Sequence, residues 1–148
     1  GVIGVAPQAE IYAVKVLGDD GSGSFQMIAE GIEWAIENNM DIISMSLGSY
    51  VGSDILHKAI KKAYDKNITI VAAAGNDGDE DPDNDIGYPA RYDETIAVGS
   101  INKYYKRSWF SSDGEEKLNA SHGSADVLLD CLMMQDQVQV YVSSDSFR

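Results

Sequence analysis

Residues 68–76 read Ile-Thr-Ile-Val-Ala-Ala-Ala-Gly-Asn. The β-branched, apolar start predicts a buried strand, and the alanines that follow leave space beside it. Gly75 allows a turn or the close approach of another backbone. Asn76 then stands at the carboxyl end of the strand, where open α/β sheets bind ligands. Its amide could donate to a developing oxyanion, which is worth roughly 3 kcal/mol in a dry site. Asn-Asp-Gly is also a turn signal, and on this motif alone the turn is the simpler interpretation.

Composition restricts the class of protein. The chain has 148 residues, of which 44% are hydrophobic, and fits one domain or a piece of a larger one. Its formal net charge of −13 argues against nucleic acid and against an anionic membrane as partners. No apolar run has the length of a membrane span. Residues 1–7 lack a basic n-region, so we expect no signal peptide there. A single Cys131 excludes an internal disulfide framework.

Apolar periodicity predicts strands and helices in alternation. Strands are expected at residues 10–17, 41–47 and 95–100, in addition to the one that precedes Asn76. Helices are expected at residues 25–39 and, capped by Ser53, to about Lys66. Alternating strands and helices call for a parallel sheet with right-handed crossovers. The strand ends at residues 18–23, 46–48 and 75–76 should then share one edge, the usual binding site of such a sheet.

Residues 77–85 carry six carboxylates. Clustered carboxylates can hold a hard cation such as calcium, but the spacing and the glycine position do not fit an EF-hand loop. A solvated acidic loop is the better interpretation.

Four ordered segments resemble the central part of a subtilisin-type serine peptidase. They are GVIGVAPQAEIYAVKVLGDDGSGS (1–24), GIEWAIENNMDIISMSLGS (31–49), IVAAAGN (70–76) and YPARYDETIAVGSIN (88–102), and RSWFSS (107–112) extends them. The resemblance covers about residues 1–114 and implies part of a peptidase domain, with residues 115–148 as a divergent tail. The implied fold class is α/β, an incomplete subtilisin-like three-layer structure with a parallel sheet and helices on both faces.

The resemblance assigns roles by position. Asn76 matches the oxyanion-hole asparagine. Residues 46–48 match the strand that pairs with the substrate and forms one wall of the S1 pocket, residues 21–23 match the opposite strand, and residues 73–75 match the far wall and floor. Phe25 matches an aromatic lid over S4, although a core residue at the start of a helix explains it equally well. The implied substrate-binding residues are Gly21, Ser22, Gly23, Phe25, Ser46, Leu47, Gly48, Ala73, Ala74 and Gly75.

The family also binds structural calcium through main-chain oxygens. Val2 matches part of its strong site. Ala90, Tyr92 and Thr95 match a weaker cation site. The Tyr88-Pro89 bond matches a peptide bond that is cis in the family, and X-Pro bonds are those in which the cis form costs little.

The catalytic triad is not found in the sequence. The family's Asp and His motifs would precede Gly1, and its Gly-Thr-Ser-Met nucleophile motif does not follow the last matched segment. His57 should be a surface or boundary residue of the second helix, and His122 has no family role. Ser46 is a substrate-strand residue with no base near it. We therefore expect an oxyanion donor and a cleft, but no peptidase activity from this chain alone.

Three functional interpretations remain. The favoured one is a fragment of a subtilisin-like serine endopeptidase that cleaves polypeptides by acyl transfer. It would be monomeric when complete and secreted, although the family has acidic intracellular members. The second is a catalytically dead peptide-binding module. The third, a Rossmann-like nucleotide binder, is weak because residues 18–23 lack the Gly-x-Gly-x-x-Gly spacing. The small residues beside Gly75 indicate a roomy S1 pocket for large apolar side chains.

The tail suggests a frame-shifted reading of the nucleophile region. Residues 137–140 (QVQV) can be encoded so that a second frame reads Ser-Gly-Thr-Ser. The remaining frame over residues 141–148 can read Met-Ser-Ala-Ala-Ile-Val-Ser. We predict that coding DNA across and beyond the tail contains these strings and, upstream, the Asp and His motifs. A DNA sequence that cannot encode them would reject the hypothesis.

Overall fold

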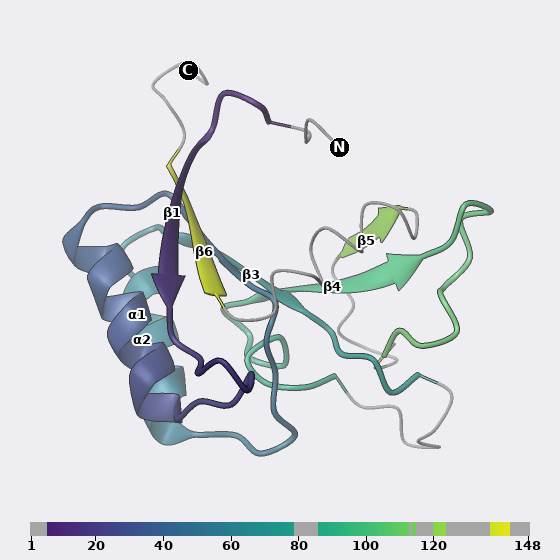
Figure 1. The fold of residues 1–148 in the computed structure, drawn as a ribbon, viewed down its shortest axis with the longest axis horizontal. Helices are drawn as coiled ribbons and strands as arrows, with labels where there is room; N and C mark the ends of the chain where they lie inside the picture. Colours follow the sequence, from purple (N-terminus) through teal and green to yellow (C-terminus); the bar gives the residue numbers. More distant parts are fainter. Residues whose placement is uncertain (1–5, 79–85, 113, 115–119, 124–136, 143–148) are drawn as a thin grey trace.

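A computed structural model describes residues 6–78, 86–112, 114, 120–123 and 137–142. Strands and helices alternate over residues 10–73, as the sequence predicts (Figure 1). In chain order they are β1 Glu10–Lys15, α1 Phe25–Glu37, β2 Ile42–Met45, α2 Asp54–Tyr64, β3 Thr69–Ala73, β4 Ile96–Ile101, β5 Ala120–Gly123 and β6 Gln137–Val142.

One six-stranded sheet organises these elements, in the order β1-β6-β2-β3-β4-β5. The pairs β2–β3, β3–β4 and β4–β5 are parallel. The expected parallel α/β sheet is therefore confirmed for β2, β3 and β4, whose carboxyl ends meet at one edge, and β5 extends it although the sequence did not predict a strand there. Within the described part, no helix is long and apolar enough to cross a membrane.

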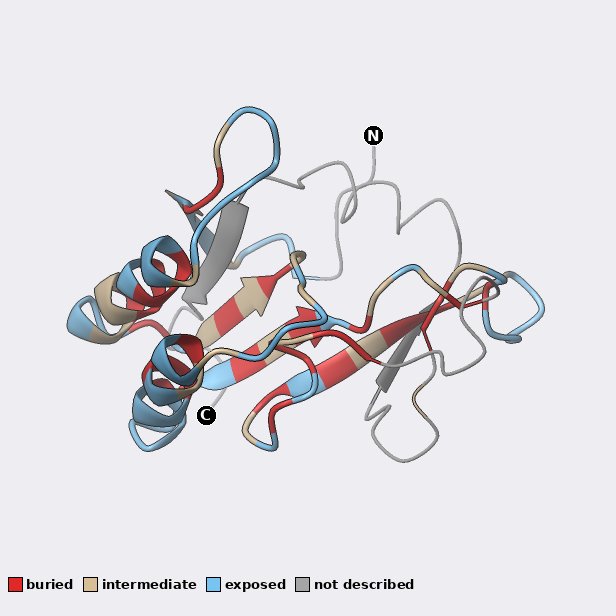
Figure 2. Cartoon of the chain, turned by 90° about the horizontal axis from the view of Figure 1, so that it is seen from below, coloured by how far each residue is buried: buried red, intermediate tan, exposed pale blue. Residues whose placement is uncertain are grey.

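Both described helices pack against each other on the same face of the sheet (Figures 1 and 2). β1, β2 and β3 follow in the same direction across the sheet. Right-handed crossovers between strands that progress in one direction place every connecting helix on one face. The second helical layer that the resemblance implies has no counterpart among the residues the structure describes.

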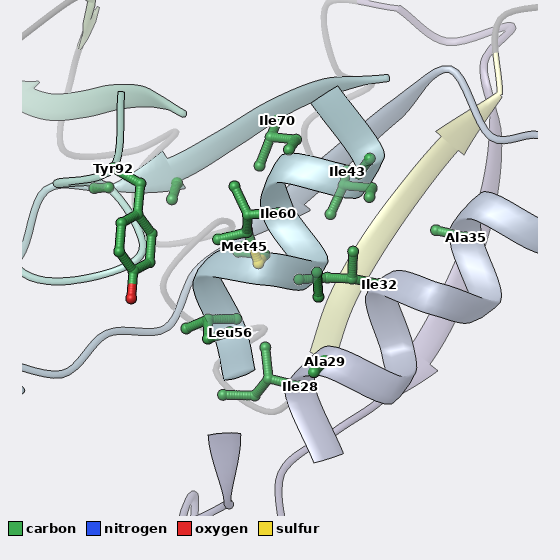
Figure 3. Close-up of a cluster of buried hydrophobic side chains, with 14 of the residues drawn as sticks. Ile28, Ala29, Ile32, Ala35, Ile43, Met45, Leu56, Ile60, Ile70 and Tyr92 are labelled. Carbon is green, nitrogen blue, oxygen red and sulfur yellow. The ribbon is translucent and has the colours of Figure 1, made fainter. Parts of the chain in front are cut away.

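The core lies between this helix pair and the sheet (Figure 3). Alternate strand residues point into it: Ile43 of β2 and Ile70 of β3 are fully buried. From the helices, Ile32 and Ile60 have no exposed surface. Burial of a side chain of this size stabilises the fold by about 1.5–3 kcal/mol. The residues between them along each strand face away from the helices, which leaves the opposite face of the sheet to the candidate site.

Two serine caps set where the helices begin. Ser24 accepts a hydrogen bond from the Met27 amide at 3.2 Å, and Ser53 accepts one from the Leu56 amide at 3.5 Å. These bonds satisfy amides that have no partner within the first helical turn. The predicted cap at Ser53 is confirmed.

The sequence did not predict β6 as a strand. It lies antiparallel between β1 and β2, with Tyr12 opposite Val140 and Ile43 also opposite Val140 (Figure 1). Neighbouring strands are about 4.8 Å apart, so the intervening strand holds β1 about 10 Å from β2.

Candidate functional site

A cavity of about 570 Å³ opens at the carboxyl ends of β2, β3 and β4. Ser44, Val71 and Val98 line its floor, and they alternate with the core residues along their strands. Seven predicted site residues line the cavity together: Ser46, Leu47, Gly48, Ala73, Ala74, Gly75 and Asn76. The structure therefore brings the predicted oxyanion donor and both predicted walls of a substrate pocket to one place.

Asn76 follows the end of β3 on an exposed corner of the cavity. Its carboxamide makes no hydrogen bond to another residue that the structure describes. The backbone just before it is fixed. The Ala74 amide donates to the Val98 carbonyl at 2.9 Å, and the Gly87 amide donates to the Ala74 carbonyl at 3.0 Å. A side chain on a fixed backbone can act as a preorganised donor.

Gly75 has a backbone conformation that only glycine adopts without strain. Its φ is +122°, and a Cβ built on it would lie 2.8 Å from Ser112 Oγ. The Ser112 amide donates to the Gly75 carbonyl at 3.1 Å. The segment before residue 113 is therefore packed directly against the strand end that carries Asn76.

A cluster of buried serines holds this packing. Ser111 Oγ accepts from the Ser100 amide at 2.8 Å, and the hydroxyls of Ser100 and Ser108 lie 2.6 Å apart. Ser112 Oγ accepts a longer bond from the Asp77 amide at 3.4 Å. Buried hydroxyls need such partners, and a satisfied network makes the local structure rigid. Residues 107–112 belong to the resemblance, but the resemblance assigns them no role.

The opposite wall is anchored by a two-bond bridge. The Ser49 amide donates to the Tyr88 carbonyl at 2.9 Å, and the Tyr88 amide returns a bond to Ser49 at 2.7 Å. The Tyr88-Pro89 peptide bond is cis, as the resemblance implies. Beside this bridge Gly48 is exposed, and a Cβ on it would meet only the Tyr88 carbonyl at 3.6 Å. The space next to the Gly48 backbone is therefore open.

Tyr50 and Asp77 also line the cavity. Sequence reasoning considered Asp77 only as part of a turn signal and as one of the carboxylates of residues 77–85, and did not consider Tyr50. The Tyr50 hydroxyl donates to Asp77 Oδ2, which links the loop after β2 to the turn after β3. The position of Asp77 directly after Asn76 was an available signal. Tyr50 gave none, because only the folded chain brings it to this edge.

The predicted residues Gly21, Ser22, Gly23 and Phe25 do not line this cavity. They follow β1, which β6 separates from β2. Phe25 is half-buried and packs against the hydrophobic core, as its alternative interpretation requires.

The loop before Phe25 is ordered by its own contacts. Asp20 Oδ1 accepts from the Ser22 amide at 3.0 Å and from its hydroxyl at 2.8 Å. These bonds hold the pKa of Asp20 below its ordinary value. Gly21 adopts φ +75°, which a turn of this kind requires.

The predicted cation positions are buried where they are described. Ala90, Tyr92 and Thr95 lie in the turn between the cis bond and β4, whereas Val2 is outside the described residues. The Thr95 amide donates to the Tyr92 carbonyl at 3.0 Å. Thr95 Oγ1 is buried without a hydrogen-bond partner. Among the described residues, no group of three or more His, Cys, Asp or Glu side chains could hold a metal.

His57 does not line the cavity. The His57 ring stacks on Tyr92 with centroids 4.2 Å apart, and its Nε2 lies 3.1 Å from Glu94 Oε2. The side chain is 45% exposed, which confirms the expected boundary position on α2. His122 lies in β5, opposite Ser100 in the sheet register.

We predict that Gly75→Ala lowers the stability of the chain by about 1–3 kcal/mol, because the substitution combines a strained φ with a steric clash. Urea unfolding measures this. The double variant Gly75→Ala/Ser112→Ala, compared with Ser112→Ala alone, isolates the backbone strain, because the clashing hydroxyl and its bond from the Asp77 amide are absent from both. Gly48→Ala is the matched control and should change little. Equal stability of Gly75→Ala and the parent chain would contradict the assignment.

Comparison with known proteins agrees with this geometry. The model of the subtilase family of peptidases matches residues 1–129. Subtilisin DY from Bacillus licheniformis is 52% identical over 116 residues, which cover 78% of this chain and 42% of that protein. Subtilisin E from Bacillus subtilis (strain 168) is 53% identical over 116 residues, 78% of this chain and 30% of that protein. The chain thus spans less than half the length of these relatives.

Solved structures show the same likeness. A structure described as S41 Psychrophilic Protease superposes with a TM-score of 0.61 at 35% identity, over 74% of this chain and 41% of that one. The protease domain of PatA, in an S218A mutant, superposes with a TM-score of 0.61 at 28% identity, over 68% of this chain and 37% of that one. Because the family model matches residues 1–129 of the 148, this chain belongs to the subtilase family of serine peptidases.

Proposed function

We propose that this chain supplies the oxyanion donor and much of the substrate cleft of a subtilisin-like serine endopeptidase. The observation that carries the proposal is the shared cavity. Asn76 lies at its corner, with the exposed edge around Gly48 on one side and the small residues 73–75 on the other. An extended peptide that adds a strand to this edge would pass its backbone beside Asn76.

Each part of the site has a chemical task in acyl transfer. When a serine attacks a peptide carbonyl, negative charge develops on the carbonyl oxygen, and the Asn76 amide would donate to it. A side chain of the substrate would enter the space beside Ala73 and Gly75, where small residues leave room. The cavity's mainly apolar floor of Val71 and Val98 favours large apolar side chains.

We also propose that this chain does not hydrolyse peptides by itself. Serines line the cavity, namely Ser44, Ser46, Ser49 and Ser100, but no histidine is among the lining residues that the structure describes. His57 is engaged with Glu94 and Tyr92 on the helix side of the molecule. A serine without a positioned base is a weak nucleophile. The second candidate, a catalytically dead peptide-binding module, rests on the same open cleft.

We predict that the purified 148-residue chain shows no hydrolysis of a peptide substrate above a blank, yet binds a neutral, extended, fluorescein-labelled apolar peptide. Gly48→Val should weaken binding by about tenfold or more, because its side chain would occupy the space where the peptide backbone pairs. Fluorescence anisotropy measures the binding. The stability of the variant should change by less than about 0.5 kcal/mol, because this space is open.

Val51→Ala, at an exposed residue of the same loop that does not line the cavity, is the control and should bind as the parent chain does. Hydrolysis by the chain would disprove the inactivity. Peptide binding that Gly48→Val leaves intact would disprove the cleft.

For the complete protein we propose polypeptide substrates, a monomeric state, secretion and structural calcium. One relative is named a minor extracellular protease, Epr from Bacillus subtilis (strain 168), at 47% identity. For calcium, the candidates are the main-chain oxygens of Val2, Ala90, Tyr92 and Thr95. The buried, unpartnered Thr95 hydroxyl supports a polar ligand in this turn. A bound cation there would tie the cis-proline turn to the start of β4.

We predict that calcium raises the urea midpoint of the chain, whereas magnesium, which demands a tighter octahedral site, does not. Binding to the folded state alone stabilises it by roughly 1.4 kcal/mol at a free calcium concentration ten times the dissociation constant. Identical midpoints with calcium and with a chelator would contradict the proposed site.

A further inference from the structure

We infer that residues 102–109, here called the basic aromatic loop, bind an acidic stretch of the polypeptide substrate outside the cleft. The loop reads Asn-Lys-Tyr-Tyr-Lys-Arg-Ser-Trp and extends beyond the end of β4 (Figure 1). None of its residues lines the cavity. The inference rests on the proposed function for its choice of a polypeptide as the ligand.

The charge of the loop opposes that of the rest of the chain. Lys103, Lys106 and Arg107 fall within five residues, and residues 102–112 contain no acidic residue, whereas the chain carries a net charge of −13. Neither lysine forms an ion pair with a carboxylate among the described residues. Such a local concentration of one sign attracts a ligand of the opposite sign over roughly a Debye length, about 8–10 Å.

Aromatic side chains stand beside these charges and are unusually exposed. Tyr104 is 70% exposed, Tyr105 is 85% exposed and Trp109 is 68% exposed. Lys103 Nζ lies 5.2 Å from the centre of the Tyr104 ring. Tyrosine and tryptophan combine a large apolar surface with a hydrogen-bond donor and lose little conformational freedom on binding. This mixture suits a polypeptide with carboxylate side chains.

The loop is preformed by its own hydrogen bonds. The Asn102 amide donates to the Lys106 carbonyl at 2.7 Å, and the Tyr105 amide donates to the Asn102 carbonyl at 2.9 Å. The Asn102 side-chain oxygen accepts from the amides of Tyr104 and Lys106, at 2.9 and 3.2 Å. Tyr105 is held at φ +60°. A ligand therefore meets a preformed loop backbone, which lowers the entropy cost of binding.

The loop is joined to the cleft by short main-chain contacts. Phe110, directly after the loop, accepts a hydrogen bond from the Gly78 amide at 3.0 Å, and the Ser112 amide donates to Gly75. Gly75 and Asn76 line the cavity. A polypeptide that leaves the cleft past Asn76 could therefore reach the loop. Nucleic acid is disfavoured as a ligand, because three cations in a chain of net charge −13 cannot neutralise an extended row of phosphates.

The test is anisotropy of a fluorescein-labelled peptide of alternating Glu and Gly, compared with the same peptide carrying Gln, on the full 148-residue chain. We expect tighter binding of the Glu peptide and loss of the difference at high salt. Lys103→Glu/Lys106→Glu should weaken binding of the Glu peptide by about tenfold or more. Tyr104→Ser/Tyr105→Asn should also weaken it, with charge unchanged and with asparagine tolerating the positive φ.

The matched control is Lys58→Glu/Lys61→Glu on the exposed side of α2, which changes the net charge by the same amount. It should leave binding within about twofold of the parent, because its charges lie on another element. The inference would be overturned if the two double-lysine variants lost the same amount of Glu-peptide affinity, or if the Glu and Gln peptides bound equally well. Tighter binding of single-stranded oligothymidylate than of the Glu peptide would also overturn it. The neutral peptide and Gly48→Val test the cleft separately, so failure of the loop and failure of the proposed function are distinguishable.

Discussion

Main-chain hydrogen bonds hold the end of β3 from three sides, and the candidate site depends on them. Ala74 is bonded to Val98 of β4 and to Gly87, and Gly75 is bonded to Ser112. Each such bond contributes only about 1 kcal/mol to stability. Their combined effect is geometric, because they hold the backbone before Asn76 through contacts to three other segments. An oxyanion donor is effective only if it is already in place when the charge develops.

The two faces of the sheet have separate tasks. Ile43 and Ile70 point to the helix pair and form the core, whereas Ser44 and Val71 face the cavity. The same two strands thus stabilise the fold and build the site, since successive side chains of a strand point to opposite faces. Small and modest side chains on the second face keep a space of about 570 Å³ open where larger ones would fill it.

Charge is distributed unevenly around this cleft. Asp77 lines the cavity, accepts a hydrogen bond from Tyr50 and begins an acidic stretch of sequence. The basic aromatic loop directly precedes residues 110–112, which pack on the backbone of Gly75 and Gly78. The buried serines between them carry no charge and connect the two regions through fixed hydrogen bonds. A substrate would therefore meet negative charge near Asp77 and positive charge near the basic aromatic loop.

The sequence by itself determined the alternation of strands and helices, the serine cap at Ser53, the family and the group of residues around Asn76. These follow from local periodicity, capping chemistry and short motifs, which act over a few residues. Only the tertiary structure decided where β6 pairs, because strand pairing between distant segments leaves no local signal. That pairing separates residues 21–23 from the cavity. The placing of Tyr50 beside Asp77 and of the serine cluster beneath Gly75 also depends on contacts between segments far apart in the chain.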